Sequence, residues 1–225
     1  MEDLLVEKSK RLASAETNPE CNSCTNNKCF IYRYCSKESI NILELNKRVL
    51  NYKKGQYIFY EGDPVQGLYI IRTGKAKVLS TGYNKKTQII RLSKTGQLLG
   101  HRGLGDKYYL ISAAAIDDSV ICFVETNVFT QILKNDSELT YELMLLFVNE
   151  LRISESRMKN LAQMTVREKS AEALLLLKQS FGIRKKDGIV LDAILTRKDM
   201  ADLAGLSTEQ ITKCFSEFRQ EQIIQ

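Results

Sequence analysis

Thiols near the start of the chain are the first residues whose spacing could do chemistry, because closely spaced cysteines bind metal ions or metal clusters. The six cysteines are Cys21, Cys24, Cys29, Cys35, Cys122 and Cys214. In a small secreted protein the first four would indicate disulfides, whereas in a 225-residue chain without a secretion signal they indicate a metal or cluster site. A structural zinc ion on the first four, and free or oxidised thiols, are the alternatives.

The second informative set of residues lies at 196–220, where caps and a turn predict a helix-turn-helix. Thr196 can cap a short helix together with Asp199, and Ser207 can cap the next one. Gly205 fits the tight turn between the two helices because glycine adopts a positive φ without strain. Ile211 falls where an apolar side chain must fill the space between the helices. An ordinary helical hairpin is the alternative.

The second helix of this unit carries polar residues that suit base edges in the major groove of DNA. Glu209, Thr212 and Lys213 share one face; a carboxylate accepts from cytosine N4, and a lysine donates to guanine. Thr212 suits a thymine methyl group or a phosphate. The remaining predicted DNA contacts position the helix on the phosphates; they are Arg197, Ser207, Thr208 and Gln210. A solvated helix face is the alternative.

Composition limits the classes of function. Only one histidine, His101, is present, so sites that need two or three imidazoles are excluded, and we expect no enzyme. The formal net charge of +6 fits an anionic partner such as nucleic acid. No apolar run approaches the ~20 residues of a membrane span, so we expect no membrane partner and a cytoplasmic location.

Two further patterns predict the elements that position these residues. Short alternating apolar runs over 49–125, separated by glycine turns, predict an antiparallel roll. A helical stretch without glycine or proline follows over 137–164, and its apolar residues recur at spacings of three and four. This spacing predicts a homodimer seam with one polar member. The seam residues are Met144, Phe147, Leu151, Ser154, Met158 and Leu161. A helix packed only on its own roll is the alternative.

A cysteine arm, a roll, a long helix and a helix-turn-helix, in that order, resemble the Crp/Fnr superfamily of transcription regulators. Residues 55–74 look like the first strands of that family's roll, and 96–100 look like a later glycine turn. Residues 208–213 are similar to its recognition helix, with Lys213 in place of an arginine. The resemblance implies a homodimer that reads an inverted repeat in double-stranded DNA and contacts RNA polymerase.

The iron–sulfur branch of this superfamily, of the fumarate–nitrate reduction regulator type, carries three arm cysteines and a fourth in a late roll strand. Cys21, Cys24 and Cys29 match the arm with one residue fewer in the second spacing, and Cys122 lies in the matching strand. Cys35 is an alternative fourth ligand. The resemblance therefore implies a [4Fe–4S] cluster that senses oxygen, nitric oxide or redox state.

Two other ligands are known in this superfamily and remain alternatives here. A cyclic nucleotide would need a glutamate where His101 stands and an arginine where residues 110–112 lie, and neither is present. Haem would use His101. With either ligand in the roll, the cysteines would be a zinc site or free thiols.

The sequence thus predicts an α+β protein with an antiparallel β jelly roll of the cyclic-nucleotide-binding type. We expect a cysteine-rich arm over 1–35, the roll over 36–136, a dimerisation helix over 137–165 and a helix-turn-helix domain over 166–225. The family continues into a two-stranded wing, and a chain that stops at Gln225 is expected to lack it.

Overall fold

The computed structural model describes Cys21, Cys24 and residues 26–225 except residue 187. The first 20 residues of the predicted arm lie outside this described part. The N-terminal elements are α2 (Phe30–Tyr34), α3 (Lys37–Asn46), β1 (Arg48–Tyr52), β2 (Tyr57–Phe59), β3 (Gly67–Thr73), β4 (Lys75–Thr81), β5 (Thr87–Lys94), β6 (Leu98–Leu99), the 3-10 turn η1 (His101–Gly103), β7 (Ser112–Ala115) and β8 (Ser119–Glu125). The C-terminal elements are α4 (Thr126–Asn135), α5 (Ser137–Gln163), α6 (Val166–Phe181), β9 (Gly182–Lys185), β10 (Gly188–Leu191), α7 (Arg197–Ala204) and α8 (Thr208–Gln220).

The roll consists of two four-stranded antiparallel sheets, as the alternating runs predict. Their strand orders are β1-β8-β3-β6 and β2-β7-β4-β5. Strand β8 is central to the first sheet, where Cys122 lies opposite Val49 of β1 and Ile70 of β3. Apolar side chains of both sheets fill the space between them and form one buried cluster. This arrangement confirms the predicted α+β fold with an antiparallel roll.

Short helices cover the outer face of the sheet that holds β8. Strand β3 is buried along most of its length, because the roll core lies on one side and helices lie on the other. The outer cluster joins residues of α3, α4 and the first turns of α5 to this sheet; Leu43, Phe129 and Leu139 are among its buried members. Burial of these side chains, each contributing about 1.5–3 kcal/mol, fixes the start of α5 against the roll.

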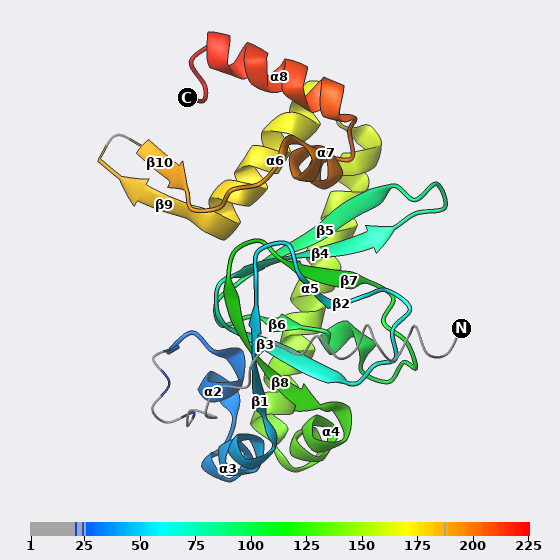
Figure 1. Cartoon of the computed structure of the whole chain (residues 1–225), viewed down its shortest axis with the longest axis vertical. Helices are drawn as coiled ribbons and strands as arrows, with labels where there is room; N and C mark the ends of the chain where they lie inside the picture. The colour runs from blue at the N-terminus through cyan, green and yellow to red at the C-terminus, as the bar shows by residue number, and fades with distance from the viewer. Residues whose placement is uncertain (1–20, 22–23, 25, 187) are drawn as a thin grey trace.

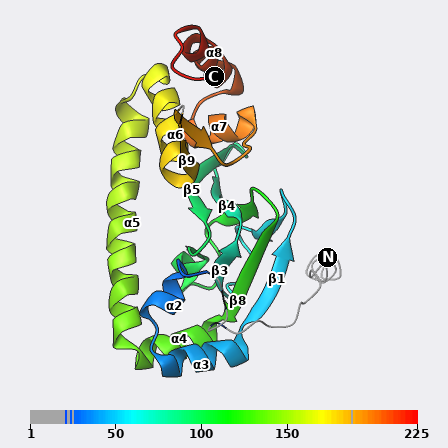
Figure 2. The same ribbon diagram turned by 90° about the vertical axis from the view of Figure 1, so that its left-hand side faces the viewer.

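Helix α5 runs along one side of the roll and connects it to the C-terminal domain (Figures 1 and 2). Asp136 caps its N-terminus by accepting a hydrogen bond from the backbone of Leu139 at 3.1 Å. At its far end, Met164 and Thr165 break the helix, and Thr165 caps α6 in a capping box with Glu168. The two helices therefore meet at a sharp turn, which places α6 beside the roll.

The C-terminal domain packs on the sheet that ends with β5. One buried cluster contains Ile89 of β5 together with Ala173 of α6 and Met200 of α7. Polar contacts reinforce this packing: Arg157 of α5 donates to the carbonyl oxygens of Ile90 at 2.7 Å and Leu203 at 3.0 Å. The helix-turn-helix is thus fixed relative to both the roll and α5.

Among the described residues, no helix has the length and apolar content needed to cross a membrane.

Candidate nucleic-acid interface and thiol pocket

The turn between α7 and α8 has the local geometry that its residue types predict. Thr196 and Asp199 form a capping box at the start of α7, and Ser207 and Gln210 form another at the start of α8. Gly205 ends α7 with a φ of 68°, which a side chain would strain. Ile211 is completely buried between the helices. Local capping and one apolar contact therefore fix the angle at which α8 leaves the turn.

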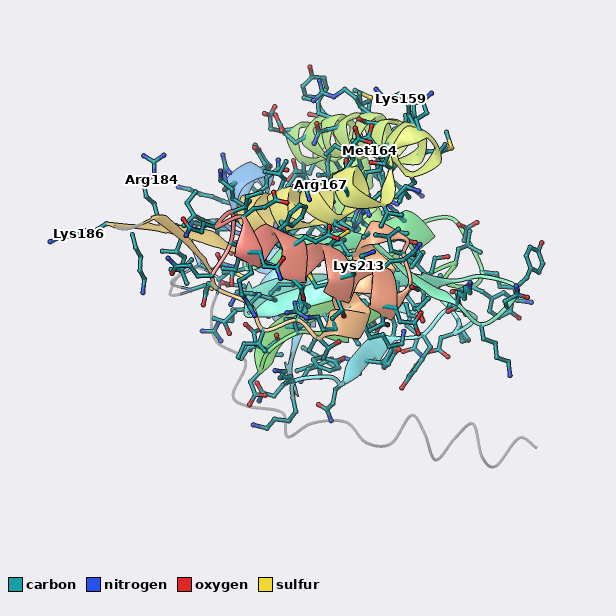
Figure 3. The ribbon with its side chains drawn as sticks, turned by 90° about the horizontal axis from the view of Figure 1, so that it is seen from above. Lys159, Met164, Arg167, Arg184, Lys186 and Lys213 are labelled. Carbon is teal, nitrogen blue, oxygen red and sulfur yellow. The ribbon has the colours of Figure 1, made fainter. Side chains whose placement is uncertain are left out.

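Helix α8 lies on the outer surface of the domain (Figure 3). Its predicted base-reading residues are exposed. Glu209, Thr212 and Lys213 face solvent, and so does Thr208. The hydroxyl of Thr212 donates to the carbonyl oxygen of Thr208 at 2.6 Å, which orients its methyl group. The opposite face of the helix is apolar and buried, and Cys214 is one of its core residues. A polar face at the N-terminal half of α8 is thus free to enter a groove.

Of the other predicted DNA contacts, Ser207 and Gln210 cap helix α8, and Arg197 is exposed at the start of α7. Ser207 and Gln210 are exposed but already bond each other's backbone N–H groups, at 3.2 Å and 3.0 Å. Arg197 is exposed at the start of α7, with its guanidinium 5.1 Å from the centre of the Phe215 ring. Figure 3 also shows Arg184 projecting from the β9–β10 hairpin, a basic side chain outside the predicted set.

Four of the cysteines line one pocket, which we call the thiol pocket. They are Cys21, Cys24 and Cys29 from the arm and Cys122 from β8. The pocket lies between the arm, α3 and the first sheet, and its walls are apolar side chains such as Leu43 and Ile70. Two cationic residues, Lys47 and Arg72, also line it. Cys35, the alternative ligand, is the residue that ends α2 and does not line this pocket.

Backbone contacts hold the described part of the arm against the roll. The side-chain amide of the buried Asn26 donates to the carbonyl oxygen of Ile71 at 3.3 Å, and the backbone N–H of Phe30 donates to the carbonyl oxygen of Gly96 at 2.9 Å. A Cβ on Gly96 would collide with the carbonyl oxygen of Lys28, so only glycine permits this approach. These contacts bring the arm cysteines over β8, which sequence spacing could not predict.

Burial and nearby charged groups shift the pKa values of three of the thiols. The pKa of Cys122 is raised to about 12, mainly by burial; Lys47 acts against this rise, and the thiols of Cys21, Cys24 and Cys29 add to it. Burial also raises the pKa of Cys29. The pKa of Cys35 rises to about 12 through burial and the carboxylate of Asp136. Protonated thiols are therefore favoured, and a bound cation would have to displace their protons.

The four pocket thiols match in number the ligands of a tetrahedral metal ion or of a four-iron cluster. Within the described part of the chain, no three histidine, cysteine, aspartate or glutamate side chains are placed to hold one metal ion. A tetrahedral zinc site needs four thiolates about 2.3 Å from one centre. A four-iron cluster instead binds each thiolate at a different iron, so its ligands stand farther apart. Four soft thiolates in an apolar pocket with nearby cations fit such a group.

A buried charge cluster, which sequence reasoning missed, joins the roll to α5. Glu150 of α5 has a side chain only 10% exposed and bonds Arg91 of β5, Arg102 of η1 at 2.9 Å and His101 Nε2 at 3.1 Å. Hydrogen bonding from His101 and the charges of both arginines hold the pKa of Glu150 at about 2, against the opposing effect of burial. Burial lowers the pKa of His101. A neutral imidazole that donates to Glu150 fits these contacts.

The exposed apolar stripe of α5 differs in part from the predicted seam. Met144, Leu151 and Met158 are exposed, and Ser154 is exposed with its hydroxyl on the carbonyl oxygen of Glu150. Phe147 instead packs beside the ring of His101, and Leu161 is half-buried. The large apolar residues of α5 left exposed are Tyr141, Met144, Leu145, Val148, Leu151, Ile153 and Met158. Tertiary packing therefore uses part of the predicted stripe within the protomer.

Aromatic side chains fill the interior of the roll. Phe59 stacks on Tyr69 and Tyr109, with ring centres 5.3 Å and 4.3 Å apart. Tyr109 donates to the carbonyl oxygen of Gly67 at 2.7 Å. His101, at the position where a ribose-binding glutamate would stand, is engaged by Glu150.

Two domain families match the chain. Residues 49–136 match the cyclic nucleotide-binding domain, and residues 168–225 match the Crp-like helix-turn-helix domain. Among curated relatives, the transcriptional activator protein anr of Pseudomonas aeruginosa is 26% identical over 80% of this chain and 74% of its own length. The electron transport regulator A of Shewanella oneidensis is 23% identical over 97% and 88% of the two chains.

Among solved structures, FixK2 from Bradyrhizobium japonicum superposes with a TM-score of 0.70. It is 22% identical and covers 80% of this chain and 87% of that one. At this identity the likeness concerns the fold.

Proposed function

Because the chain belongs to the Crp/Fnr family of transcription regulators, we propose that it is an oxygen- or redox-responsive member that binds DNA as a homodimer. Its proposed sensor is a [4Fe–4S] cluster held by Cys21, Cys24, Cys29 and Cys122. The observation that carries this proposal is that arm and roll thiols line a single pocket. The relative from Shewanella is named as an electron transport regulator, which points the same way.

Recognition of DNA is assigned to α8. Glu209 and Lys213 are exposed on its N-terminal half, and the capping boxes and buried Ile211 hold the helix rigidly. The proposed operator is an inverted repeat, since a two-fold dimer presents two such helices. The apolar stripe of α5 is proposed to form the dimer contact, because an exposed stripe of this length on one helix favours a partner. Contact with RNA polymerase is proposed from the family alone.

A bound cluster would supply oxidant-sensitive iron–thiolate bonds between the arm and the roll. The arm connects to the dimer helix through a short path: the N–H of Ser36 donates to Asp136 at 2.8 Å, and Asp136 caps α5. We propose that release of the arm from Cys122 weakens this cap and the packing of α5. The energy for the switch is the difference in stability between the two arrangements.

The roll is proposed to bind neither a cyclic nucleotide nor haem. Stacked aromatic rings fill its interior, and Glu150 engages His101. Leu110 and Ile111 stand where a phosphate-binding arginine is expected, so a buried phosphate would lack a charge partner.

Anaerobic purification of the full chain tests the sensor. We expect stoichiometric iron and sulfide with broad absorbance near 400 nm, and loss of both with loss of DNA binding in air. Cys122→Ser should abolish the cluster, whereas Cys35→Ser and the core control Cys214→Ser should retain it. Zinc in place of iron, or no metal with unchanged DNA binding in air, would refute the cluster. Gel shifts with a palindromic library test operator binding separately.

A further inference from the structure

Lys47 stands at the point where the arm, α3 and the first sheet meet. It follows the last turn of α3 and precedes β1, and its N–H donates to the carbonyl oxygen of Leu43 at 2.8 Å. The next residues pair with β8, where Val49 lies opposite Cys122. The helix before Lys47 and the strand after it therefore fix its backbone. This limits the directions that its side chain can take.

The side chain of Lys47 extends into the thiol pocket. The residue is 5% exposed, which is unusual for lysine and requires a polar or charged neighbour for its ammonium group. Its Nζ donates to Cys21 Sγ at 3.0 Å. Lys47 lines the same pocket as Cys122, so its side chain lies near the roll thiol as well as the arm thiols.

We propose that Lys47 is a positioning residue for the cluster, which holds the Cys21 sulfur at the site and offsets the negative charge of the four thiolates. This inference rests on the proposed function. Four thiolates in an apolar pocket are costly unless cations compensate them, and hydrogen bonds to cluster sulfurs together with local charge set reduction potentials. A cation at this place stabilises the more reduced, more negative cluster and so raises its reduction potential.

The test compares Lys47→Met with Lys47→Arg in the full chain, purified without oxygen. Methionine keeps the buried stem and removes the charge, and arginine restores the charge. Lys37→Met, at the exposed start of the same helix, is the matched control for loss of one positive charge. Circular dichroism and the size of each variant establish that it folds.

We expect Lys47→Met to shift the reduction equilibrium of the cluster by about tenfold towards oxidation, which is about 59 mV for a one-electron couple. Its absorbance near 400 nm should decay several-fold faster in air-saturated buffer. Lys47→Arg and Lys37→Met should resemble the wild type. Cluster assembly in Lys47→Arg but not in Lys47→Met would also support the inference.

Three results separate the two proposals. A wild-type protein that holds a cluster whose potential and decay are the same in Lys47→Met overturns the role of Lys47 alone. Equal loss of the cluster in folded Lys47→Met and folded Lys47→Arg would also overturn the role of the Lys47 charge, and would leave the proposed function standing. A wild-type protein without iron and sulfide overturns the proposed function, and the role of Lys47 falls with it.

Discussion

Replacing Glu150 by glutamine should uncouple α5 from the roll. Glu150 accepts hydrogen bonds from Arg91, Arg102 and His101, so glutamine would leave two buried or half-buried cations without their counter-charge. The pKa of Glu150 falls from 4.5 to about 2, and at 1.36 kcal/mol per unit this corresponds to about 3 kcal/mol. Removing one partner of a buried ion pair typically costs about 3–5 kcal/mol, which agrees with the value from the pKa shift.

The sign of the pH dependence follows from the same shift. Because the pKa is lower in the folded state, the stabilisation is complete above pH 4.5 and is lost as the pH falls towards about 2. The difference in unfolding free energy between wild type and Glu150→Gln should therefore be constant from pH 7 to pH 5. It should shrink progressively below pH 4.5.

Urea unfolding at several pH values measures this difference. Protein concentration must be the same throughout, since the proposed dimer would make apparent stability depend on it. Glu155→Gln, an exposed carboxylate on the same helix, is the matched control and should change stability by less than about 0.5 kcal/mol. A Glu150→Gln loss below about 1 kcal/mol at pH 7, or a loss that does not vary down to pH 3, would refute the reasoning.

Three further predictions concern the other sites. Glu209→Ala should cost about 1–3 kcal/mol at one base pair of each half-site in gel shifts, and equal weakening on all sequences would contradict base reading. Leu151→Glu, at a position 61% exposed on α5, should convert a dimer to monomers in sedimentation; an unchanged dimer would place the contact elsewhere. Gly205→Ala, at a φ of 68° and with a Cβ 3.1 Å from Leu161 Cδ2, should lower thermal stability by about 1–2 kcal/mol; calorimetry showing an equal or higher midpoint would argue against the strain.

The helix-turn-helix was predictable because local residue chemistry specifies it. Thr196 and Ser207 cap their helices through bonds that span three residues, and Gly205 takes the positive φ that the turn requires. The exposure of Glu209 and Lys213 follows from the helical period once Ile211 is assigned to the core. Such features depend on near neighbours in sequence, so a single chain contains enough information to place them.

The thiol pocket was only half predictable. The spacing of Cys21, Cys24 and Cys29 indicated a site, and a family resemblance connected them to Cys122. Nothing in the spacing indicated Lys47, whose place in the pocket results from the turn between α3 and β1. Side chains that meet through separate elements leave no periodic signal in the sequence.

By itself, the sequence determined the order of the roll, the long helix and the helix-turn-helix, because hydrophobic period, caps and turn residues act over a few positions. It did not determine which residues of α5 pack within the protomer, since Phe147, a residue of the predicted seam, contacts the ring of His101. Nor did it indicate that Glu150 would lie among Arg91, Arg102 and His101. Only the tertiary structure decided these points, because packing of distant segments sets which charges are buried together and which apolar side chains remain for a partner.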